Sequence, residues 1–299
     1  MKNEVLFINV LYFSLLLRGF IFLVDWFIDS ILPTKPFSTL AYFLFFMKQL
    51  VILVTGGTGF LGKRVVSLLQ KNGHRVIVHH RGVQAIPTHA DVIVNLVGVI
   101  REDEQTFKEA HVDKVAWVLR LGKKLGVRQF VQVSALGVPY AVTNYQKTKL
   151  HAEQLVKESG LHYVIVRPSM MFGKEDKSIN MFRTVCRTGF FPLFANGNVQ
   201  PVSVDVVAQL IVVAVEGKLK NRVVEVAGPE IFTYAQLADR IHPGVRLLKL
   251  PRFFITIITL FGSFIHSLPT KEQVVMLGQS IVTKEKTLER LGIKNVTLK

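Results

Sequence analysis

Residues 51–62 read VILVTGGTGFLG, an apolar segment that runs directly into a Gly-x-x-Gly-x-x-Gly turn. The glycines of this turn are Gly56, Gly59 and Gly62. The first permits a sharp exit from a strand, the second lets the backbone approach a pyrophosphate, and the third allows the next helix to pack closely. Phosphate groups bind to free N–H groups at a helix N-terminus. The stretch therefore predicts a dinucleotide-binding strand, turn and helix.

The residues on both sides of the turn supply the context that this motif needs. Residues 50–54 have a strand-like apolar pattern, and residues 63–70 have a helix-like one. We expect the cofactor to contact the turn and the start of the helix, at Gly56, Thr58, Gly59, Phe60, Leu61 and Gly62. A glycine turn without a ligand is the alternative, because a chain with 21 glycines can produce such spacing by chance.

Composition and charge restrict the class of protein. The chain has 299 residues, 49% of them hydrophobic, which is ample for a folded core. Its single cysteine, Cys186, excludes an intrachain disulfide framework and a cysteine metal cluster. The histidines, among them His111, have no metal-like spacing, and we interpret them as ordinary surface or core residues. The net charge of +16 belongs to residues 47–299, because residues 1–46 hold equal numbers of basic and acidic residues. Such a charge favours phosphorylated ligands or an anionic membrane surface, with a solvated basic surface as the alternative. The sequence shows no nucleic-acid module.

Residues 1–46 form an apolar N-terminal extension. Residues 5–24 are long enough to cross a bilayer as a helix, but Arg18 lies well inside them. Two interpretations are open. The extension is a transmembrane or interfacial anchor, or translation naturally starts at Met47, just before the first strand. The corresponding location of the protein is the cytoplasm or the cytoplasmic face of a membrane.

The end of the second predicted strand indicates which dinucleotide binds. Residues 75–80 have a strand pattern, and Arg81 follows them. NAD-selective sites place an acidic residue near this point to bond the ribose 2′-hydroxyl. Residues 47–90 contain no Asp or Glu, whereas the guanidinium of Arg81 matches a 2′-phosphate, and Lys63 or Arg64 could assist from the turn. We predict NADP(H) in preference to NAD(H); an ordinary surface role for Arg81 is the alternative.

The remaining pattern of the first half alternates strands with helices. Residues 91–97 predict a buried parallel strand, residues 104–125 a helix, and residues 130–134 another strand. This alternation predicts an α/β fold with a doubly wound parallel sheet of the Rossmann type. About nine residues separate Arg81 from Asp91, too few for a strand and a crossover helix. One β-α unit is therefore predicted to be shortened.

A second group of residues carries acid–base chemistry. Ser134 ends a predicted strand, and the sequence YQKTK that begins at Tyr145 opens a helix. A spacing of four places Tyr145 and Lys149 on one helical face. We expect the Lys149 ammonium to lower the pKa of the Tyr145 phenol. Tyr145 would then exchange a proton with a substrate carbonyl or hydroxyl, Lys149 would also hold the nicotinamide ribose, and Ser134 would bond the substrate oxygen.

These motifs carry a family resemblance. Over residues 48–299 the chain resembles the extended and atypical short-chain dehydrogenase/reductase (SDR) superfamily. The resemblance lies in the sequence motifs TGGTGFLG, VSALGV, YQKTKLHAE, VIVRPSMMFG and QPVSVDVVAQLI. The most similar branch contains the nucleotide-binding accessory subunit of mitochondrial complex I and its bacterial relatives. It shares the short gap from Ser134 to Tyr145 and the Gln-Pro-Val phrase at residues 200–202.

The resemblance implies roles for further residues. Ser134, Tyr145 and Lys149 occupy the positions of the catalytic triad, and Pro168, within Arg167-Pro168-Ser169, lies at a strand end beside the nicotinamide. Leu96, Val97 and Gly98 line the cofactor from the other side. The shortened β-α unit and the N-terminal extension depart from the family pattern, and the shortening puts cofactor affinity in question.

The second half of the chain is predicted to complete the sheet and to form a smaller lobe. We divide the chain into the extension 1–46, a nucleotide-binding domain 47–169, and residues 170–299, which supply the remaining strands and an α-rich substrate lobe. Residues 206–215 and 234–241 predict helices, and 222–226 a strand. Residues 251–268 predict a strongly apolar helix, for which we expect a buried position, with an interfacial position against lipid as the alternative.

Three functions fit this sequence. The first is an NADP(H)-dependent oxidoreductase acting on an unidentified small-molecule, lipid or quinone-related substrate. The second is a non-catalytic nucleotide-binding scaffold or assembly factor of a membrane respiratory complex. The third is a nucleotide-sugar epimerase or dehydratase. This function is disfavoured because the substrate lobe lacks a recognisable sequence motif for binding a nucleotide sugar.

Overall fold

A computed structural model describes residues 49–80, 86–176, 178–261 and 268–298. The predicted N-terminal anchor and the predicted cofactor contact at Arg81 lie outside these residues. Contacts within Leu50–Lys299 join this part of the chain into one unit.

The centre of the fold is a six-stranded sheet in which every pair of neighbours is parallel. Its order is β10-β5-β4-β3-β1-β2. The strands are β1 (Val51–Thr55), β2 (Arg75–His79), β3 (Val92–Asn95), β4 (Gln129–Val133), β5 (His162–Pro168) and β10 (Arg222–Val226). The central strands are continuous buried runs, as expected for a parallel sheet covered on both faces.

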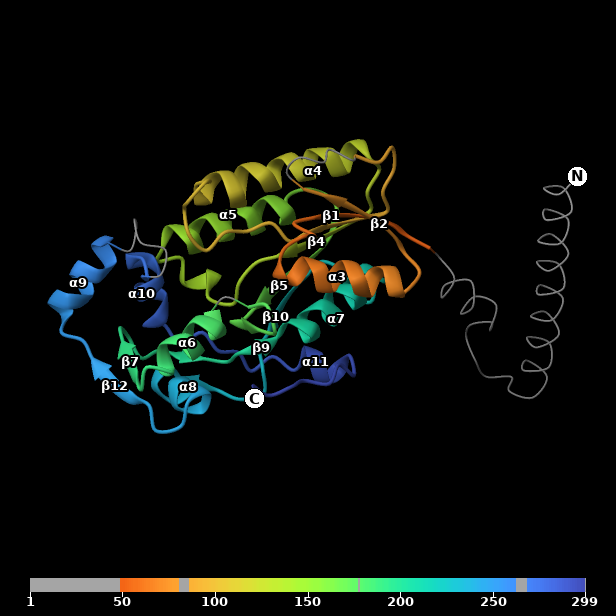
Figure 1. The fold of residues 1–299 in the computed structure, drawn as a ribbon. Coiled ribbons are helices and arrows are strands. Elements are labelled where there is room, and N and C mark those ends of the chain that lie inside the picture. Colours follow the sequence, from red (N-terminus) through yellow and green to blue (C-terminus); the bar gives the residue numbers. More distant parts are fainter. Residues whose placement is uncertain (1–48, 81–85, 177, 262–267, 299) are drawn as a thin grey trace, which may run out of the picture. The chain divides into compact units, whose positions relative to one another are not determined.

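Two layers of helices cover the sheet (Figure 1). Helices α3 (Phe60–Lys71) and α7 (Val204–Val215) pack against one face in a core that includes Leu61, Val65 and Leu210. Helices α4 (Lys114–Lys124) and α5 (Asn144–Lys157) cover the other face through Val115, Val118 and Ala152, among others. This arrangement confirms the predicted doubly wound Rossmann-type fold.

The edge of the sheet lies at β2, which pairs only with β1 among the described strands. Among the described residues between His79 and Val92, no helix or further strand occurs. The next described strand, β3, lies on the other side of β1. The described residues of this connection therefore agree with the predicted shortening of one β-α unit.

The helix predicted over residues 104–125 begins later. A π-helical turn, η1 (Lys108–Asp113), precedes α4. The backbone N–H of Thr106 donates to Oε2 of Glu109 (2.8 Å), and the backbone N–H of Glu109 donates to Oγ1 of Thr106 (3.2 Å). This reciprocal capping fixes the start near Thr106, which explains why the predicted boundary at Glu104 was too early.

The second lobe has its own core. Helices α6 (Ser178–Cys186) and α8 (Tyr234–Ile241) pack there against β7 (Phe190–Leu193), which pairs with β12 (Arg246–Lys249). The smaller elements are η2 (Val138–Tyr140), β6 (Met171–Phe172), β8 (Asn198–Val199), β9 (Val202–Ser203), β11 (Phe232–Thr233), α10 (Lys271–Leu277) and α11 (Thr287–Arg290).

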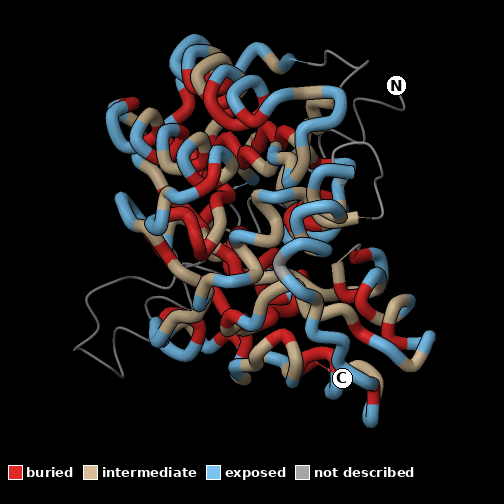
Figure 2. The backbone as a smooth tube through the Cα atoms, turned by 90° about the vertical axis from the view of Figure 1, so that its left-hand side faces the viewer, coloured by how far each residue is buried: buried red, intermediate tan, exposed pale blue. Residues whose placement is uncertain are grey.

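The buried position expected for the apolar helix at residues 251–268 is wrong for its described part. Helix α9 (Arg252–Phe261) carries five large apolar side chains that are exposed to solvent. Figure 2 views the molecule from the side on which α9 lies in Figure 1. Apolarity alone indicated burial, but the packing leaves this helix at the surface.

Candidate functional site

The glycine turn has the geometry that its sequence predicts. Gly56 has a φ of +75°, and a methyl group there would lie 3.0 Å from the backbone nitrogen of Val97. A methyl group at Gly62 would lie 2.2 Å from the carbonyl oxygen of Gly56. The first and third glycines are therefore required by the turn and by its contact with α3. Gly56 also places the turn against Leu96 and Val97, two predicted cofactor contacts at the end of β3.

The start of α3 suits an anionic ligand. Gly59 is exposed and forms the N-cap without a side-chain hydrogen bond, and the first turn of the helix holds no acidic residue. Its N–H groups therefore have no competing carboxylate from this turn. Thr58 is exposed beside them, and Phe60 lies against Gly173 of the second lobe. The side chain of Leu61 belongs to the core, which leaves only its backbone to contact a ligand.

The two basic residues that could assist with a 2′-phosphate are both in ion pairs. Nζ of Lys63 lies 2.7 Å from Oε2 of Glu175, and Nε of Arg64 lies 3.3 Å from Oδ1 of Asp205. All four side chains are more than half exposed, so these pairs are weak. The two ion pairs nevertheless connect α3 to residues in the second half of the chain.

A buried row of polar side chains crosses the carboxyl ends of three strands. Oγ1 of Thr55 donates to Oδ1 of Asn95, and Nδ2 of Asn95 donates to Oε1 of Gln132 (2.8 Å). The three residues are directly opposite one another in the registers of β1, β3 and β4. This row fixes the relative heights of the strand ends from which the candidate site residues extend.

Lys149 joins two of these strand ends. Its side chain is only 5% exposed, and its Nζ donates to the carbonyl oxygen of Val133 at the end of β4 (3.2 Å). A methyl group at Gly98 would lie 2.8 Å from the same Nζ, so Gly98 borders the ammonium. Burial lowers the pKa of Lys149 to about 8, against an opposing effect of Glu153. The structure thus brings Lys149 and Gly98 together as one candidate site.

Tyr145 differs from its predicted electrostatics. Its ring packs edge-on against Phe107 and His111, with centroids 5.7 and 5.4 Å away. Burial raises the pKa of Tyr145 to about 12. The expected lowering of this pKa by Lys149 is therefore wrong, because desolvation of the phenolate is the dominant effect. At neutral pH the Tyr145 side chain is a neutral phenol, which can donate a proton.

His111 connects the same elements and was interpreted from sequence as an ordinary surface or core residue. It is 1% exposed, which confirms a core position. Its Nε2 lies 3.2 Å from the nitrogen and 3.1 Å from the oxygen of Val99, and its Nδ1 lies 3.0 Å from Oγ1 of Thr148. Burial, followed by the charge of Lys149, lowers the pKa of His111 to about 3. This neutral imidazole holds the segment after β3 against the helix that carries Tyr145.

The depressed pKa of His111 predicts an acid-dependent loss of stability. Because an unfolded histidine binds a proton near pH 6.5 and the folded one only near pH 3, the stability is complete above pH 6.5 and falls as the pH drops toward 3. At pH 5 the protonation of His111 in the unfolded chain lowers the free energy of unfolding by about 2 kcal/mol. Urea unfolding at pH 7 and pH 5 should show this extra loss in the native protein but not in His111→Gln. The exposed His162→Gln serves as the control, and an unchanged pH dependence in His111→Gln would contradict the prediction.

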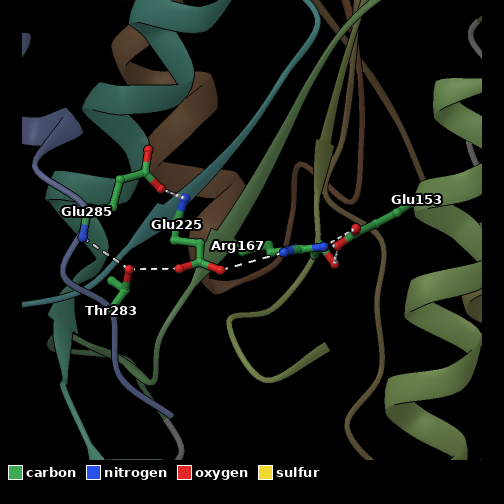
Figure 3. A network of polar contacts seen from close by, with 6 residues as sticks. Glu153, Arg167, Glu225, Thr283 and Glu285 are labelled. Carbon is green, nitrogen blue, oxygen red and sulfur yellow. Dashed lines mark hydrogen bonds and ion pairs between the residues drawn. The ribbon is translucent and has the colours of Figure 1, made fainter. Parts of the chain in front are cut away.

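The hydroxyl of Ser134 donates its proton to a carboxylate of the protein. Its side chain is 5% exposed, and its Oγ donates to Oε1 of the buried Glu153 (2.6 Å). Nε and Nη2 of Arg167 donate to the same carboxylate at 2.9 and 2.6 Å (Figure 3). The hydroxyl proton of Ser134 is therefore used inside the protein, and its predicted bond to the substrate oxygen has no support in this geometry.

The network around Glu153 extends across the sheet to the C-terminal segment (Figure 3). Nη1 of Arg167 lies 3.6 Å from Oε1 of Glu225 in β10, and Oγ1 of Thr283 donates to Oε2 of Glu225 (2.7 Å). The sequence reasoning missed Glu153, although a signal was present. Tyr145, Lys149 and Glu153 follow one another at intervals of four, which places all three on one face of α5.

The end of β5 offers one further polar group. Pro168 accepts a backbone hydrogen bond from Leu136, which lies just after β4. The following Ser169 is 5% exposed, and its Oγ has no hydrogen-bond partner among the described residues. Ligands of open α/β sheets bind outside the carboxyl ends of the strands, so an unpartnered hydroxyl at this edge fits a bound group.

This fold and turn agree with a known family. A model of the NAD dependent epimerase/dehydratase family matches residues 52–200. These residues belong to that family. The match includes the glycine turn, the end of β3 and the Tyr145–Lys149 helix, and the family binds an NAD(P) dinucleotide.

Two curated relatives of this chain carry the name of one respiratory-complex subunit. The mitochondrial NADH dehydrogenase (ubiquinone) 1 alpha subcomplex subunit 9 of Arabidopsis thaliana is 31% identical over 68% of this chain and 60% of its own length. The protein of the same name from Dictyostelium discoideum is 25% identical over 65% of this chain and 64% of its own length. The chain thus spans less than two thirds of these relatives. The similarity confirms the predicted resemblance to the complex I accessory subunit branch.

Solved structures share the fold at low identity. Pal from Bacillus thuringiensis has a TM-score of 0.64 at 16% identity and covers 83% of this chain and 95% of its own. WbmH from Bordetella bronchiseptica, solved in complex with NAD+, has a TM-score of 0.62 at 15% identity and covers 84% and 94%. Both similarities concern the fold alone.

The described residues contain neither a membrane-spanning helix nor a metal-binding cluster. None of the helices in the described ranges has the length and apolarity needed to cross a membrane. Within the same ranges, no group of three or more His, Cys, Asp or Glu side chains has a metal-binding arrangement.

Proposed function

We propose that this protein is an NADP(H)-dependent reductase of the SDR type, with Tyr145 as proton donor and Lys149 as the residue that holds the nicotinamide ribose. The observation that carries the proposal is the position of Lys149. Its ammonium is buried between Gly98 and the carbonyl of Val133, and it lies one helical turn from Tyr145.

The residues at this edge of the sheet fit a dinucleotide. Gly59 presents an uncapped helix start without carboxylates, Gly98 leaves no side chain between the backbone and Lys149, and Ser169 has an unpartnered hydroxyl among the described residues. The phosphates would be held by the first turn of α3, and the nicotinamide end by the segment of Leu96, Val97 and Gly98, Lys149 and Pro168. When bound, the nicotinamide supplies the hydride.

The protein side chains would supply the proton. Because burial raises the pKa of Tyr145 to about 12, its phenol is neutral at pH 7 and is a donor rather than a base. In this state the hydroxyl can deliver a proton to a carbonyl oxygen while the carbonyl carbon accepts a hydride. One proton of Lys149 is directed to Val133, and its other protons are available for ribose hydroxyls. The substrate is a small molecule or lipid that carries a carbonyl or quinone group.

The nucleotide site can be tested without a known substrate. We expect NADP(H) to copurify with the protein and added NADPH to raise its melting temperature, because a ligand that binds only the folded state stabilises it. Gly59→Val should abolish this shift, since its branched side chain occupies the approach of the pyrophosphate. Gly59 has a φ of −73°, which any residue can adopt, and a methyl group there would lie 3.3 Å from the carbonyl oxygen of Gly56. The variant should therefore fold, and its NADPH shift is measured from its own ligand-free melting temperature. An undiminished NADPH shift in Gly59→Val would contradict the proposed site.

The preference for NADP(H) rests on the charges that follow β2. Residues 47–90 contain no acidic residue, and Arg81 follows the strand. Replacing Arg81 with Asp is expected to weaken NADPH binding while leaving NADH binding similar, because a carboxylate repels a 2′-phosphate and accepts a ribose hydroxyl. Calorimetric titration of each nucleotide measures the ratio of affinities. Lys71→Asp, on the exposed end of α3, makes the same charge change as a control. An unchanged ratio in Arg81→Asp would refute the assignment.

A second candidate function is a non-catalytic, nucleotide-binding subunit of a membrane respiratory complex. Two observations favour it. The relatives from Arabidopsis thaliana and Dictyostelium discoideum are named as NADH dehydrogenase subunits, and the hydroxyl of Ser134 is held by Glu153. In this case the bound nucleotide would stabilise the fold or report the redox state. The Tyr145→Phe variant distinguishes the two candidates.

A further inference from the structure

Helix α9 presents an apolar face to solvent. Phe253 and Leu260 are 68% and 67% exposed, and Phe254, Ile257 and Phe261 are exposed beside them. Their spacing places these five side chains on one side of the helix. The opposite side, which includes Ile255 and Ile258, is half-buried. Because a surface helix of a soluble protein normally turns polar residues outward, this outward face indicates a partner.

One face of two nearby strands is also apolar and exposed. Leu248 of β12 and Phe190 of the paired strand β7 are both exposed. They share a face of this two-stranded sheet, because Phe190 pairs with Arg246, two residues before Leu248. Strand β12 is joined to α9 by Leu250 and Pro251. We call the following set the α9 surface: Phe190, Leu248, Phe253, Phe254, Ile257, Leu260 and Phe261.

The chain segment that contains β12 and α9 is basic. Residues 246–261 contain Arg246, Lys249 and Arg252 and no Asp or Glu, and the nearest acidic residues in the sequence are Asp239 and Glu272. Arg246 and Lys249, at the two ends of β12, are exposed, and neither has an ion-pair partner among the described residues. Aromatic and aliphatic side chains beside unpaired basic residues are the combination that binds an anionic bilayer surface.

We propose that the α9 surface is the face with which this protein binds an anionic lipid bilayer, with the side chains of α9 inserted between the headgroups and Arg246 and Lys249 in contact with their charges. A second copy of the chain is a poorer occupant, since a two-fold interface would bring the same basic residues near one another. Lipid phosphates neutralise these charges instead.

The proposed docking face is connected to the candidate site through α10. Helix α10 packs beside α9, and the carboxylate of its Glu272 accepts hydrogen bonds from the backbone N–H groups of Asn144 (2.9 Å) and Tyr145 (3.2 Å). Binding of α9 to a bilayer would therefore bring the start of the Tyr145 helix close to the lipid. The docking proposal goes beyond the proposed reductase function and does not depend on it.

A site-specific probe tests the docking face in the full chain, including residues 1–46. Cys186 is the only native cysteine and is fully buried, so a cysteine introduced at Leu260 can be labelled selectively with the polarity-sensitive dye NBD. The matched control carries NBD at Ile231→Cys, which is 54% exposed outside the α9 surface. Both proteins are mixed with vesicles of phosphatidylcholine alone and of phosphatidylcholine with phosphatidylglycerol.

We expect the emission of NBD at position 260 to shift to the blue and brighten with phosphatidylglycerol vesicles, while NBD at position 231 does not change. No response at position 260, or equal responses at both positions, would overturn the proposal. A blue shift at position 260 that appears without vesicles and grows with protein concentration would overturn it in favour of a second copy.

A charge variant tests the basic contribution separately. Arg246→Gln with Lys249→Gln, in the protein labelled at position 260, should lower partitioning into phosphatidylglycerol vesicles by about 30-fold at low salt, at roughly 1 kcal/mol for each basic residue. The control replaces the exposed Lys71 and Lys157 with Gln, which gives the same net charge. Equal losses in the two double variants would contradict a role for β12 and support only a non-specific effect of the net charge.

Discussion

Replacing Glu153 with alanine is expected to lower the free energy of unfolding by about 3–5 kcal/mol, the typical cost of removing one partner of a buried ion pair. Glu153 is fully buried and accepts hydrogen bonds from Ser134 and twice from Arg167. Without it, the guanidinium of Arg167, which is only 13% exposed, retains Glu225 at 3.6 Å as its remaining partner in an ion pair. Urea unfolding measured by circular dichroism gives the difference.

An exposed ion pair provides the control. Glu175→Ala removes the partner of Lys63, and both side chains are about 60% exposed, so we expect a loss below about 1 kcal/mol. Adding Arg167→Leu to Glu153→Ala should recover part of the lost stability, because the double variant no longer buries an unpaired charge. Similar losses in Glu153→Ala and Glu175→Ala would show that the network in Figure 3 does not stabilise the fold.

Replacing Tyr145 with phenylalanine is expected to slow the oxidation of bound NADPH by quinone or long-chain ketone acceptors by about 10²–10⁴-fold, the usual contribution of a positioned proton donor. The substitution removes only the hydroxyl, and the ring retains its contacts with Phe107 and His111. Nucleotide affinity should therefore stay within about twofold of the native value. Absorbance at the NADPH band follows turnover, and calorimetry follows binding.

Tyr140→Phe is the matched control for Tyr145→Phe. Tyr140 lies five residues earlier, is exposed, and donates its hydroxyl proton to the carbonyl oxygen of Ser280. This variant should retain full turnover. If Tyr145→Phe is as active in cells as the native protein while Gly59→Val is not, the reductase proposal fails and the non-catalytic subunit is favoured.

The local elements were readable from the sequence because their causes are local. Turn chemistry at Gly56 and Gly62 and the apolar periodicity around them predicted β1 and α3, and the same reasoning gave the bounds of β10 (Arg222–Val226) and α8 (Tyr234–Ile241). The Rossmann-type sheet followed from the alternation of such elements, and its shortened edge followed from counting residues after β2.

The electrostatic state of the site was decided only by the tertiary structure. The sequence placed Tyr145 and Lys149 on one helical face, but not the degree of burial that raises one pKa to about 12 and lowers the other to about 8. It named Ser134, but not Glu153, 19 residues later in the chain, which accepts the proton of its hydroxyl. A pKa depends on desolvation by residues that are distant in sequence, and no local pattern reports that quantity.

The position of α9 was decided in the same way. Its composition matches a buried helix and a lipid-facing helix equally well, because both are apolar on most of their surface. The packing of the second lobe covers Ile255 and Ile258 only partly and leaves Phe253 and Leu260 exposed. The sequence by itself thus determined a nucleotide-binding fold and the residues that could act in it. Only the tertiary structure decided which of those residues have their polar groups free and which apolar face has no partner within the described chain, because both depend on contacts between distant segments.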